Sequence, residues 1–378
     1  MGDIGKPYSG LSGKSASDFG EGAQYITYKS IFDNARVDIS RNEYVKITNK
    51  EREIGSQNQV KRGDVFFTIS SETPEEVGMS SVLLDDINDC YLNSFCFGYR
   101  LTTPRVRPEF LRFYLRSNKI RKQISILAQG STRFNISKNE IMRIPMMAPS
   151  VVEQNKLAVF LELIEERIAI QNKTIEDLKK LKAALEEKIF ASVQGHLTPL
   201  SEILVERVEK SSTNNQYEIL SSTISGIYSQ REYFNKDIAS SDNTGYKVIH
   251  KSDIVLSPQN LWMGNINFND KFDIGIVSPS YKVFSIRPEF DSRYVALLLK
   301  TKRALWNYML VSEQGASVVR RNLNIESFWG ISFKIPSMDT QKRIGQGIRC
   351  IELKIEREME YLAGLQKQKT FLLNNLFV

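Results

Sequence analysis

Residues 154–190 read QNKLAVFLELIEERIAIQNKTIEDLKKLKAALEEKIF, a stretch that holds neither glycine nor proline. Its apolar side chains recur on alternating three- and four-residue steps, which is the spacing of a coiled-coil seam. The seam positions are Leu157, Leu161, Ile164, Ile168, Ile175, Leu178, Leu185 and Ile189. We therefore predict one long helix over roughly 154–193, about 60 Å in length at about 1.5 Å per residue.

The same seam is written a second time, 187 residues further along the chain, so that Leu157 is matched by Ile344. The second set of seam positions is Ile344, Ile348, Ile351, Ile355, Leu362, Leu365, Leu372 and Leu376. A shared seam predicts that the two helices pack on each other. The alternative is a pair of amphipathic helices that belong to separate domains.

Two polar positions interrupt each seam at matching places. Gln171 and Lys182 in the first helix correspond to Glu358 and Lys369 in the second. Polar residues within a seam tend to fix its register. A link of only six residues, 194–199, separates the first helix from the next globular segment, and the second helix leaves from that same segment. If the helices pack together, they are therefore antiparallel.

The globular segments also repeat, with short motifs in the same order in both halves. Arg107-Pro108-Glu109-Phe110 recurs as Arg287-Pro288-Glu289-Phe290, Gln129-Gly130-Ser131 is echoed by Gln314-Gly315-Ala316, Pro149-Ser150 with Gln154 by Pro336-Ser337 with Gln341, and the turn and strand from Gly63-Asp64 by those from Ser252-Asp253. We predict an α+β protein with a pseudo-two-fold internal repeat. Its parts are globular domains over 1–148 and 197–335 and spacer helices over 149–196 and 336–378.

Each globular segment mixes short strands with one helix that has proline in its first turn. The expected strands are Gln24–Tyr28, Val65–Ile69, Cys90–Leu101, Tyr217–Ser221, Ile254–Ser257 and Ile276–Phe284, and the expected helices are Pro108–Ala128 and Pro288–Val311. The length of 378 residues suits two such domains with connecting elements.

Composition and charge limit the kinds of binding partner and of metal or disulfide site that the chain is expected to have. The net charge is +7, and residues 1–147 carry the largest excess, with 21 Lys and Arg against 17 Asp and Glu. This charge suits a phosphate-bearing partner, although it is also common among ordinary proteins. Three cysteines without CxxC spacing and two distant histidines disfavour structural zinc and a disulfide framework. No apolar run is long enough for a membrane span, so we expect a cytoplasmic protein.

Motifs for catalysis are missing from the sequence. Gly10–Ser15 resembles a phosphate-binding loop, but Tyr8 stands where the pattern needs its first glycine. A DNA-amino methyltransferase would need a Pro-Pro motif, and the chain contains no Pro-Pro pair. The two histidines fall in no nucleophile, acid–base or metal grouping. We therefore expect a non-catalytic chain without a cofactor or metal of its own.

Polar and basic loops are the better candidates for function. The segments 129–135 and 314–322 place hydroxyl, amide and guanidinium groups on glycine-bearing loops, and such groups bind phosphates and base edges. The alternative is a solvated turn in each case, and most aromatic side chains fall where core packing accounts for them. The candidate DNA-binding residues are Lys29, Ser70, Ser71, Gln129, Ser131, Thr132, Arg133, Asn135, Arg231, Ser257, Gln259, Asn260, Ser317, Arg320 and Arg321.

Two globular segments, each followed by Pro-Ser-x-x-x-Gln and a heptad helix ending at Phe190 or Phe377, resemble the specificity subunits of type I restriction-modification systems. The resemblance covers essentially the whole chain. It implies that each domain reads one half of an interrupted, asymmetric DNA sequence and that the helices set the gap between the halves. It also implies two methyltransferase subunits, which bind S-adenosylmethionine and methylate adenine, and restriction subunits in the full complex.

Two features depart from this pattern. Met1-Gly2-Asp3-Ile4 matches the interior stretch Leu200-Ser201-Glu202-Ile203, so we expect either a truncated or a flush start. The two domains share little outside the motifs above, which suits an asymmetric DNA target and equally suits a domain that has lost its role. Two rival functions remain: a coiled-coil scaffold whose domains bind protein, and a DNA-modifying enzyme in its own right. Binding that is insensitive to salt would favour the scaffold.

Overall fold

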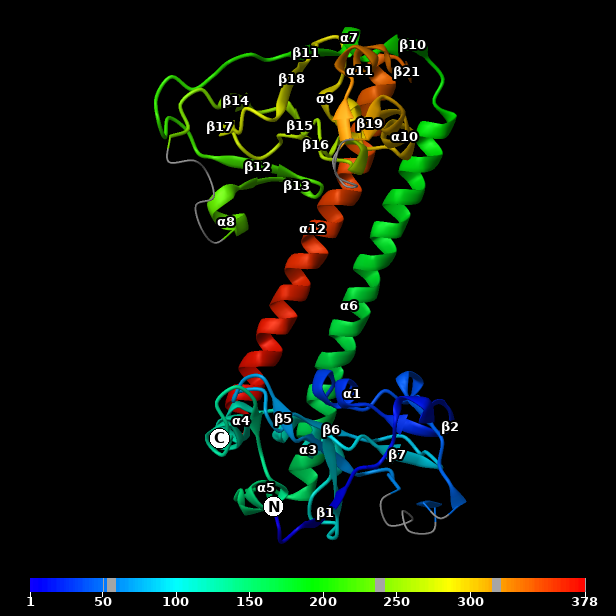
Figure 1. Cartoon of the computed structure of the whole chain (residues 1–378), viewed down its shortest axis with the longest axis vertical. Coiled ribbons are helices and arrows are strands. Elements are labelled where there is room, and N and C mark those ends of the chain that lie inside the picture. The colour runs from blue at the N-terminus through cyan, green and yellow to red at the C-terminus, as the bar shows by residue number, and fades with distance from the viewer. Residues whose placement is uncertain (50, 53–58, 235–241, 315–320, 378) are drawn as a thin grey trace. The chain divides into compact units, whose positions relative to one another are not determined.

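The computed structural model describes residues 1–49, 51–52, 59–234, 242–314 and 321–377. Its contacts divide the chain into two compact units, Met1–Asn172 with Glu360–Val378, and Lys173–Met359. Each unit holds one mixed α/β globular part and one half of each long helix (Figure 1). The units therefore part in the middle of the helices, whereas the boundaries expected from sequence fall at the helix ends.

The first unit is built on a four-stranded antiparallel sheet of order β1-β8-β4-β6. These strands are Gly5–Ser9, Cys96–Leu101, Val65–Thr68 and Ser80–Val82. A second sheet has the order β3-β2-β7, with strands Glu43–Val45, Phe19–Ile26 and Cys90–Leu92, and β5 (Ser70–Ser71) pairs with β9 (Phe134–Asn135). Its helices are η1 Ala16–Asp18, α1 Tyr28–Asp33, η2 Ile39–Arg41, α3 Pro108–Tyr114, α4 Asn118–Ile126 and α5 Lys138–Arg143.

The second unit repeats this plan with a sheet of order β11-β18-β15-β16, again antiparallel throughout. These strands are Leu204–Glu206, Lys282–Ile286, Ile254–Leu256 and Ile266–Phe268. The remaining strands are paired as β10 His196–Pro199 with β21 Ser332–Ile335, β12 Leu220–Thr223 with β13 Gly226–Ser229, β14 Lys247–His250 with β17 Ile274–Val277, and β19 Ser312–Gln314 with β20 Arg321–Leu323. Its helices are α7 Leu200–Ile203, α8 Gln230–Phe234, η3 Leu261–Met263, α9 Ser292–Leu298, α10 Lys302–Leu310 and α11 Ile325–Gly330.

The long helices are α6, Val151–Ser192, and α12, Met338–Asn375. Every predicted seam position on both helices is buried or half-buried. In the first unit the Lys369 ammonium lies 2.7 Å from a Glu165 carboxylate oxygen, and Phe377 packs in the same core as Leu157. The end of α12 therefore lies along the start of α6, which makes the pair antiparallel in this unit.

The second unit contains the matching arrangement. Lys182 lies 2.8 Å from the Glu352 carboxylate, and Phe190 joins the same core as Ile344. The pair Lys182–Glu352 is the 187-residue repeat of Glu165–Lys369, so each polar lysine of the predicted seam meets a carboxylate of the other helix. Such pairs favour one register over its neighbours.

The expected helix Pro108–Ala128 was wrong, because two helices, α3 and α4, occupy that stretch. The Ser117 hydroxyl donates to the carbonyl of Tyr114 at 2.7 Å and so satisfies the end of α3. In the second unit Thr301 does the same for Leu298 at 2.8 Å, and it also accepts from the Ala304 amide. A hydroxyl that competes for backbone groups in this way ends one helix and begins the next.

The expected start of the second helix at Pro288 was also wrong. Helix α9 begins at Ser292, with Asp291 as its N-cap, and 287–290 form a turn before it. Two glutamine side chains show which residues of the two units are structurally equivalent. The side-chain oxygen of Gln154 accepts from the Arg107 backbone amide at 2.9 Å, and that of Gln341 accepts from the Asp291 backbone amide at 2.9 Å. Arg107 therefore corresponds to Asp291, four residues beyond its match in the sequence.

Two of the expected strands are likewise interrupted. A turn at 93–95 divides Cys90–Leu101 into β7 and β8, and a turn at 278–281 divides Ile276–Phe284 into β17 and β18. The Asn93 side chain accepts from the Phe95 amide at 2.7 Å, and its carbonyl accepts from the Cys96 amide at 3.1 Å. Asparagine favours such turns because its side chain can bond the backbone two residues on.

Candidate nucleic-acid interface

Four segments of the first unit meet at Ser70. The Ile69 amide donates to the Phe95 carbonyl at 2.9 Å, and the Ile136 amide donates to the Ile69 carbonyl at 2.9 Å. The Tyr28 hydroxyl donates to the Ser70 carbonyl at 2.6 Å. The start of α1, the turn at 93–95, strand β5 and the hairpin 129–135 are thus joined by hydrogen bonds. We call residues 28–29, 70–71, 93–95 and 129–135 the Ser70 cluster.

The hairpin of the Ser70 cluster is closed by two backbone hydrogen bonds between Gln129 and Asn135, at 2.9 and 2.8 Å. Gly130 has φ +136°, and a Cβ at this position would lie 2.1 Å from the Arg133 carbonyl oxygen. Only glycine allows so close a return of the chain. The hairpin therefore presents Ser131, Thr132 and Arg133 at its exposed tip.

The predicted residues in this cluster differ in how far their side chains are already engaged. Gln129 donates to Glu140 at 2.9 Å, Asn135 to the Arg133 carbonyl at 3.3 Å, and Ser71 is buried with a bond to Glu76 at 3.3 Å. Among the predicted residues of this cluster, four are exposed and have side chains that form no hydrogen bond or ion pair with any described residue. These are Lys29, Ser131, Thr132 and Arg133.

Arg116 holds the end of α1 in place through its guanidinium. Its guanidinium donates to the carbonyls of Ile31, Phe32 and Asn34, at the end of α1, at 2.8 to 3.0 Å, and to Ser80 at 2.7 Å. Burial lowers the pKa of Arg116 to about 10, so it remains a cation at neutral pH. A cation suits the negative end of a helix dipole. Sequence reasoning missed this residue, because nothing in its local spacing marks a buried arginine.

The second unit brings two of the predicted segments together. The Arg321 amide donates to the Gln259 carbonyl at 3.1 Å, which joins strand β20 to the loop after β15. Ser257 and Asn260 lie in that loop, where the Ser257 carbonyl accepts from the Asn260 amide at 3.1 Å. The position of Gln259 beside its hairpin matches that of Ser70 beside 129–135. We call residues 257–260 and the described ends of the hairpin, 312–314 and 321–323, the Gln259 cluster.

Arg321 itself is engaged within the hairpin. Its guanidinium donates to the Ser312 carbonyl at 2.7 Å and lies 5.9 Å from the centre of the Trp262 ring. Arg321 was predicted to contact DNA, and in the structure its side chain stabilises the hairpin that carries it. Arg231 lies on α8, which follows β13 rather than β15 or β19. Ser317 and Arg320 lie outside the described residues.

In each unit a buried aspartate anchors the turn before the central strand, at the end of that strand away from the cluster. Asp64 accepts from Arg100 at 2.6 and 2.9 Å, from Tyr8 at 2.7 Å and from the Lys61 amide at 2.8 Å. Burial, together with the Asp64 charge, raises the pKa of Tyr8 far above its usual value, so the phenol stays neutral and donates.

Asp253 occupies the same position in the second unit and accepts from Arg207 at 2.8 and 3.1 Å and from the His250 amide at 2.8 Å. The two aspartates match, but Arg100 lies in β8, whereas Arg207 directly follows β11. Both units therefore have an aspartate at this position, whereas the arginine that pairs with it comes from a different segment in each unit.

Among the described residues, no group of three or more His, Cys, Asp or Glu is placed to hold a metal ion. Cys90 and Cys96 are buried, and burial raises the pKa of the Cys90 thiol to about 12. A thiol at such a pKa is a poor nucleophile at neutral pH. No described helix is both long and apolar enough to cross a membrane.

Comparison with known proteins agrees with this geometry. Residues 9–180 match the family model of the type I restriction modification DNA specificity domain. No curated protein sequence matched the chain. Among solved structures, the type I restriction-modification S subunit from M. genitalium aligns with 100% of this chain and 94% of its own, at 16% identity and a TM-score of 0.54. A chain from a structure described as the basis of complex assembly and conformational transition of the type I R-M system aligns with 99% of this chain and 97% of its own, at 14% identity and a TM-score of 0.59.

Residues 9–180 thus match the type I restriction modification DNA specificity domain, and the two solved structures share the fold of nearly the whole chain. With that domain and that fold, the chain is a type I specificity subunit, a non-catalytic protein that gives a type I complex its DNA sequence specificity. DNA and the other components of such a complex are accordingly its partners in general terms.

Proposed function

We propose that the Ser70 cluster reads one half of an interrupted, asymmetric DNA target and that the Gln259 cluster reads the other. The observation that carries this proposal is the placement of Lys29 and Arg133, two exposed cations without a partner among the described residues, beside hydroxyl groups on a rigid hairpin. Cations bind phosphates, and arginine binds guanine in the major groove. The two clusters share a scaffold but not their side chains, which suits two different half-sites.

The adenine methyltransferase subunits expected as partners need a docking surface, and α6 offers one within the first unit. Val152, Val159, Leu163 and Ile170 are exposed and follow one another on steps of seven, four and seven residues. They lie on the helix face opposite the buried seam, so packing against α12 does not cover them. An exposed apolar stripe of this kind typically marks a protein interface.

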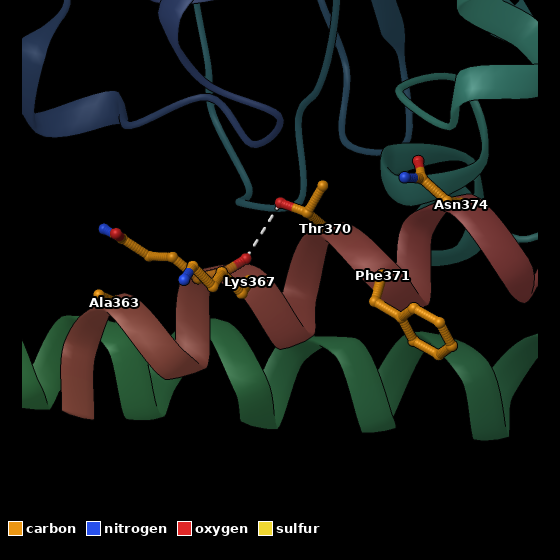
Figure 2. A pocket seen from close by; sticks show the side chains of 6 residues that line it. Ala363, Lys367, Thr370, Phe371 and Asn374 are labelled. Carbon is orange, nitrogen blue, oxygen red and sulfur yellow. Dashed lines mark hydrogen bonds between the residues drawn. The ribbon is translucent and has the colours of Figure 1, made fainter. Parts of the chain in front are cut away.

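A second surface in the same unit runs along α12. Figure 2 shows a shallow groove on this helix, with the exposed ring of Phe371 beside Lys367 and Thr370. The Thr370 hydroxyl donates to the Gln366 carbonyl at 3.0 Å, so it is engaged within the helix. The lining is free of any acid–base pair and suits contact with a helix of a partner rather than chemistry.

In the assembly that we propose, two methyltransferase subunits bind S-adenosylmethionine and flip the target adenine, since a base inside a duplex cannot be reached by an enzyme. Restriction subunits join the full complex to cleave unmodified DNA. The chain itself supplies no cofactor. We expect it in the cytoplasm, with the DNA that it reads.

The test is to map N6-methyladenine in genomic DNA from cells that express this chain with its methyltransferase subunit, and from cells that lack either one. We expect methylation confined to one interrupted sequence, and only when both proteins are present. No such mark, with a methyltransferase that is active with another specificity subunit, would contradict the proposal. Binding that does not weaken as salt rises would favour a protein scaffold instead.

A further inference from the structure

The turn at 93–95 displays one large apolar side chain within the Ser70 cluster, whose predicted DNA-binding residues are all polar or charged. The side chain of Phe95 is 63% exposed. Isolated exposed apolar residues are common and need no explanation by themselves. Phe95 differs because its backbone lies directly beside Ser70, within hydrogen-bond reach of the strand that also carries the hairpin of Arg133.

The backbone that carries Phe95 is held on both sides. Its amide donates to the Asn93 side chain at 2.7 Å, and its carbonyl accepts from the Ile69 amide at 2.9 Å. The next residue, Cys96, begins β8 and is buried. A fixed backbone lowers the entropy that is lost when the side chain contacts a ligand. Phe95 is thus presented on a fixed backbone bonded to Ile69, next to the strand that pairs with the hairpin of Arg133.

We propose that Phe95 is a specificity-determining residue that contacts the 5-methyl group of a thymine in the half-site read by the first unit. This inference rests on the proposed function of the Ser70 cluster. The thymine methyl is the one apolar group that a base pair shows in the major groove, and phenylalanine is among the side chains that contact it. The neighbouring cations attract the DNA, and the ring adds a contact with a thymine methyl group that a cation does not provide.

Comparison with the second unit supports a role of Phe95 in one half-site only. Its corresponding turn, between β17 and β18, carries Ser278-Pro279-Ser280, and the two serine hydroxyls lie 3.1 Å apart. This turn presents hydroxyl groups where the first unit presents a ring. The two half-sites are therefore read by different chemistry at equivalent positions of the fold.

The experiment compares Phe95→Ala with the wild-type chain, each assembled with its methyltransferase subunits. Met147→Ala, which truncates a 75% exposed side chain in the same unit, serves as the control. The methylated sequence is first mapped in cells. We expect Phe95→Ala to lower the preference for thymine at one position of one half-site by about tenfold. The other half-site and the Met147→Ala pattern should not change.

A second measurement does not depend on the stability of the variant. Deoxyuridine replaces each thymine of the mapped half-site in turn, which removes only the methyl group. For the wild-type complex we expect about tenfold weaker binding at one of these positions, and for Phe95→Ala no further loss there. Equal losses in both proteins, or an unchanged methylation pattern with Phe95→Ala, would overturn the role of Phe95 while leaving the specificity function intact. Absence of any sequence-confined methylation with the wild-type chain would overturn both.

Discussion

At the scale of single residues, each unit has a buried aspartate at the same position of the fold, and the two aspartates have different partners. Asp64 has a side chain only 1% exposed, and it accepts hydrogen bonds from a guanidinium, a phenol and a backbone amide. A buried charge of this kind is tolerated because its oxygens are satisfied. Its role is to fix the turn before the central strand β4, the strand that continues into the Ser70 cluster.

We expect Asp64→Ala to lower the stability of the first unit by about 3–5 kcal/mol, because Arg100 then loses its partner in a half-buried position. Thermal unfolding of the full chain measures this as a loss of roughly ten degrees in the first transition. The matched control is Asp86→Ala, since the side chain of Asp86 is 87% exposed and pairs with Arg62 at 3.3 Å. An equal effect of both variants would show that the Asp64 network does not fix the turn.

Arg133 carries the prediction for DNA binding at this scale. We expect Arg133→Ala to weaken binding of DNA by the assembled methyltransferase about tenfold, because an exposed guanidinium on the hairpin tip then no longer reaches the duplex. Arg62→Ala removes another exposed arginine of the same unit and should have little effect. Fluorescence anisotropy over a range of salt concentrations separates a phosphate contact, which lowers the salt slope, from a base contact. Unchanged affinity and an unchanged methylation pattern would remove this hairpin from the reading surface.

At the scale of elements, the heptad helices and the turn-strand motifs could be predicted from sequence because each depends on local spacing. The seam from Leu157 is an example, since every apolar step is visible in the sequence. The break at Ser117 could not be predicted, because the apolar pattern runs on through it and only the hydroxyl bond to Tyr114 ends the helix. The match of Arg107 with Arg287 was misleading for a related reason: Gln154 and Gln341 set the helix starts from far along the chain.

The candidate site divides in the same way. Segments that carry Ser70 and Arg133 could be named from their polar loops, although their meeting depends on pairing between β5 and β9. Phe95 was hidden, because the sequence from Cys90 to Leu101 reads as one continuous strand. Arg116 was hidden because its partners are carbonyl groups, which every residue has. Sequence patterns mark groups of special chemistry, and they miss side chains whose role comes from tertiary position.

Gln154 carries the prediction for this scale. Its side chain is fully buried and joins α6 to the start of α3 through the Arg107 amide, with further bonds to the carbonyls of Arg105 and Pro149 at 2.9 Å. We expect Gln154→Ala to cost about 2–4 kcal/mol, because several buried polar groups lose their partner at once. Gln194→Ala is the control, since Gln194 is exposed and makes one bond at 3.3 Å. Urea unfolding of both variants provides the comparison, and similar losses would mean that the junction does not depend on this glutamine.

At the scale of the whole molecule, the chain crosses between its two compact units twice, and each crossing lies within a long helix. The globular part of each unit is therefore joined to the other by helical backbone in both directions. Each residue added to a helix lengthens it by a fixed rise, whereas a flexible linker has no fixed end-to-end distance. If the two parts read two half-sites, the length of α6 and α12 should determine how many base pairs separate those half-sites.

We therefore expect that adding one heptad to the middle of both helices lengthens the gap in the methylated sequence while leaving each half-site as it was. Seven residues add about 10 Å at about 1.5 Å each, close to three base pairs at about 3.4 Å. A whole heptad keeps the seam in phase, so the antiparallel packing of each unit is preserved. The control inserts seven residues in α6 alone, which leaves the two helices unequal, so that the pairs Lys182–Glu352 and Glu165–Lys369 can no longer both form along one continuous seam; it should lose sequence-confined methylation. An unaltered gap with both helices lengthened would mean that the helices do not set the spacing and that partner subunits hold the reading domains instead.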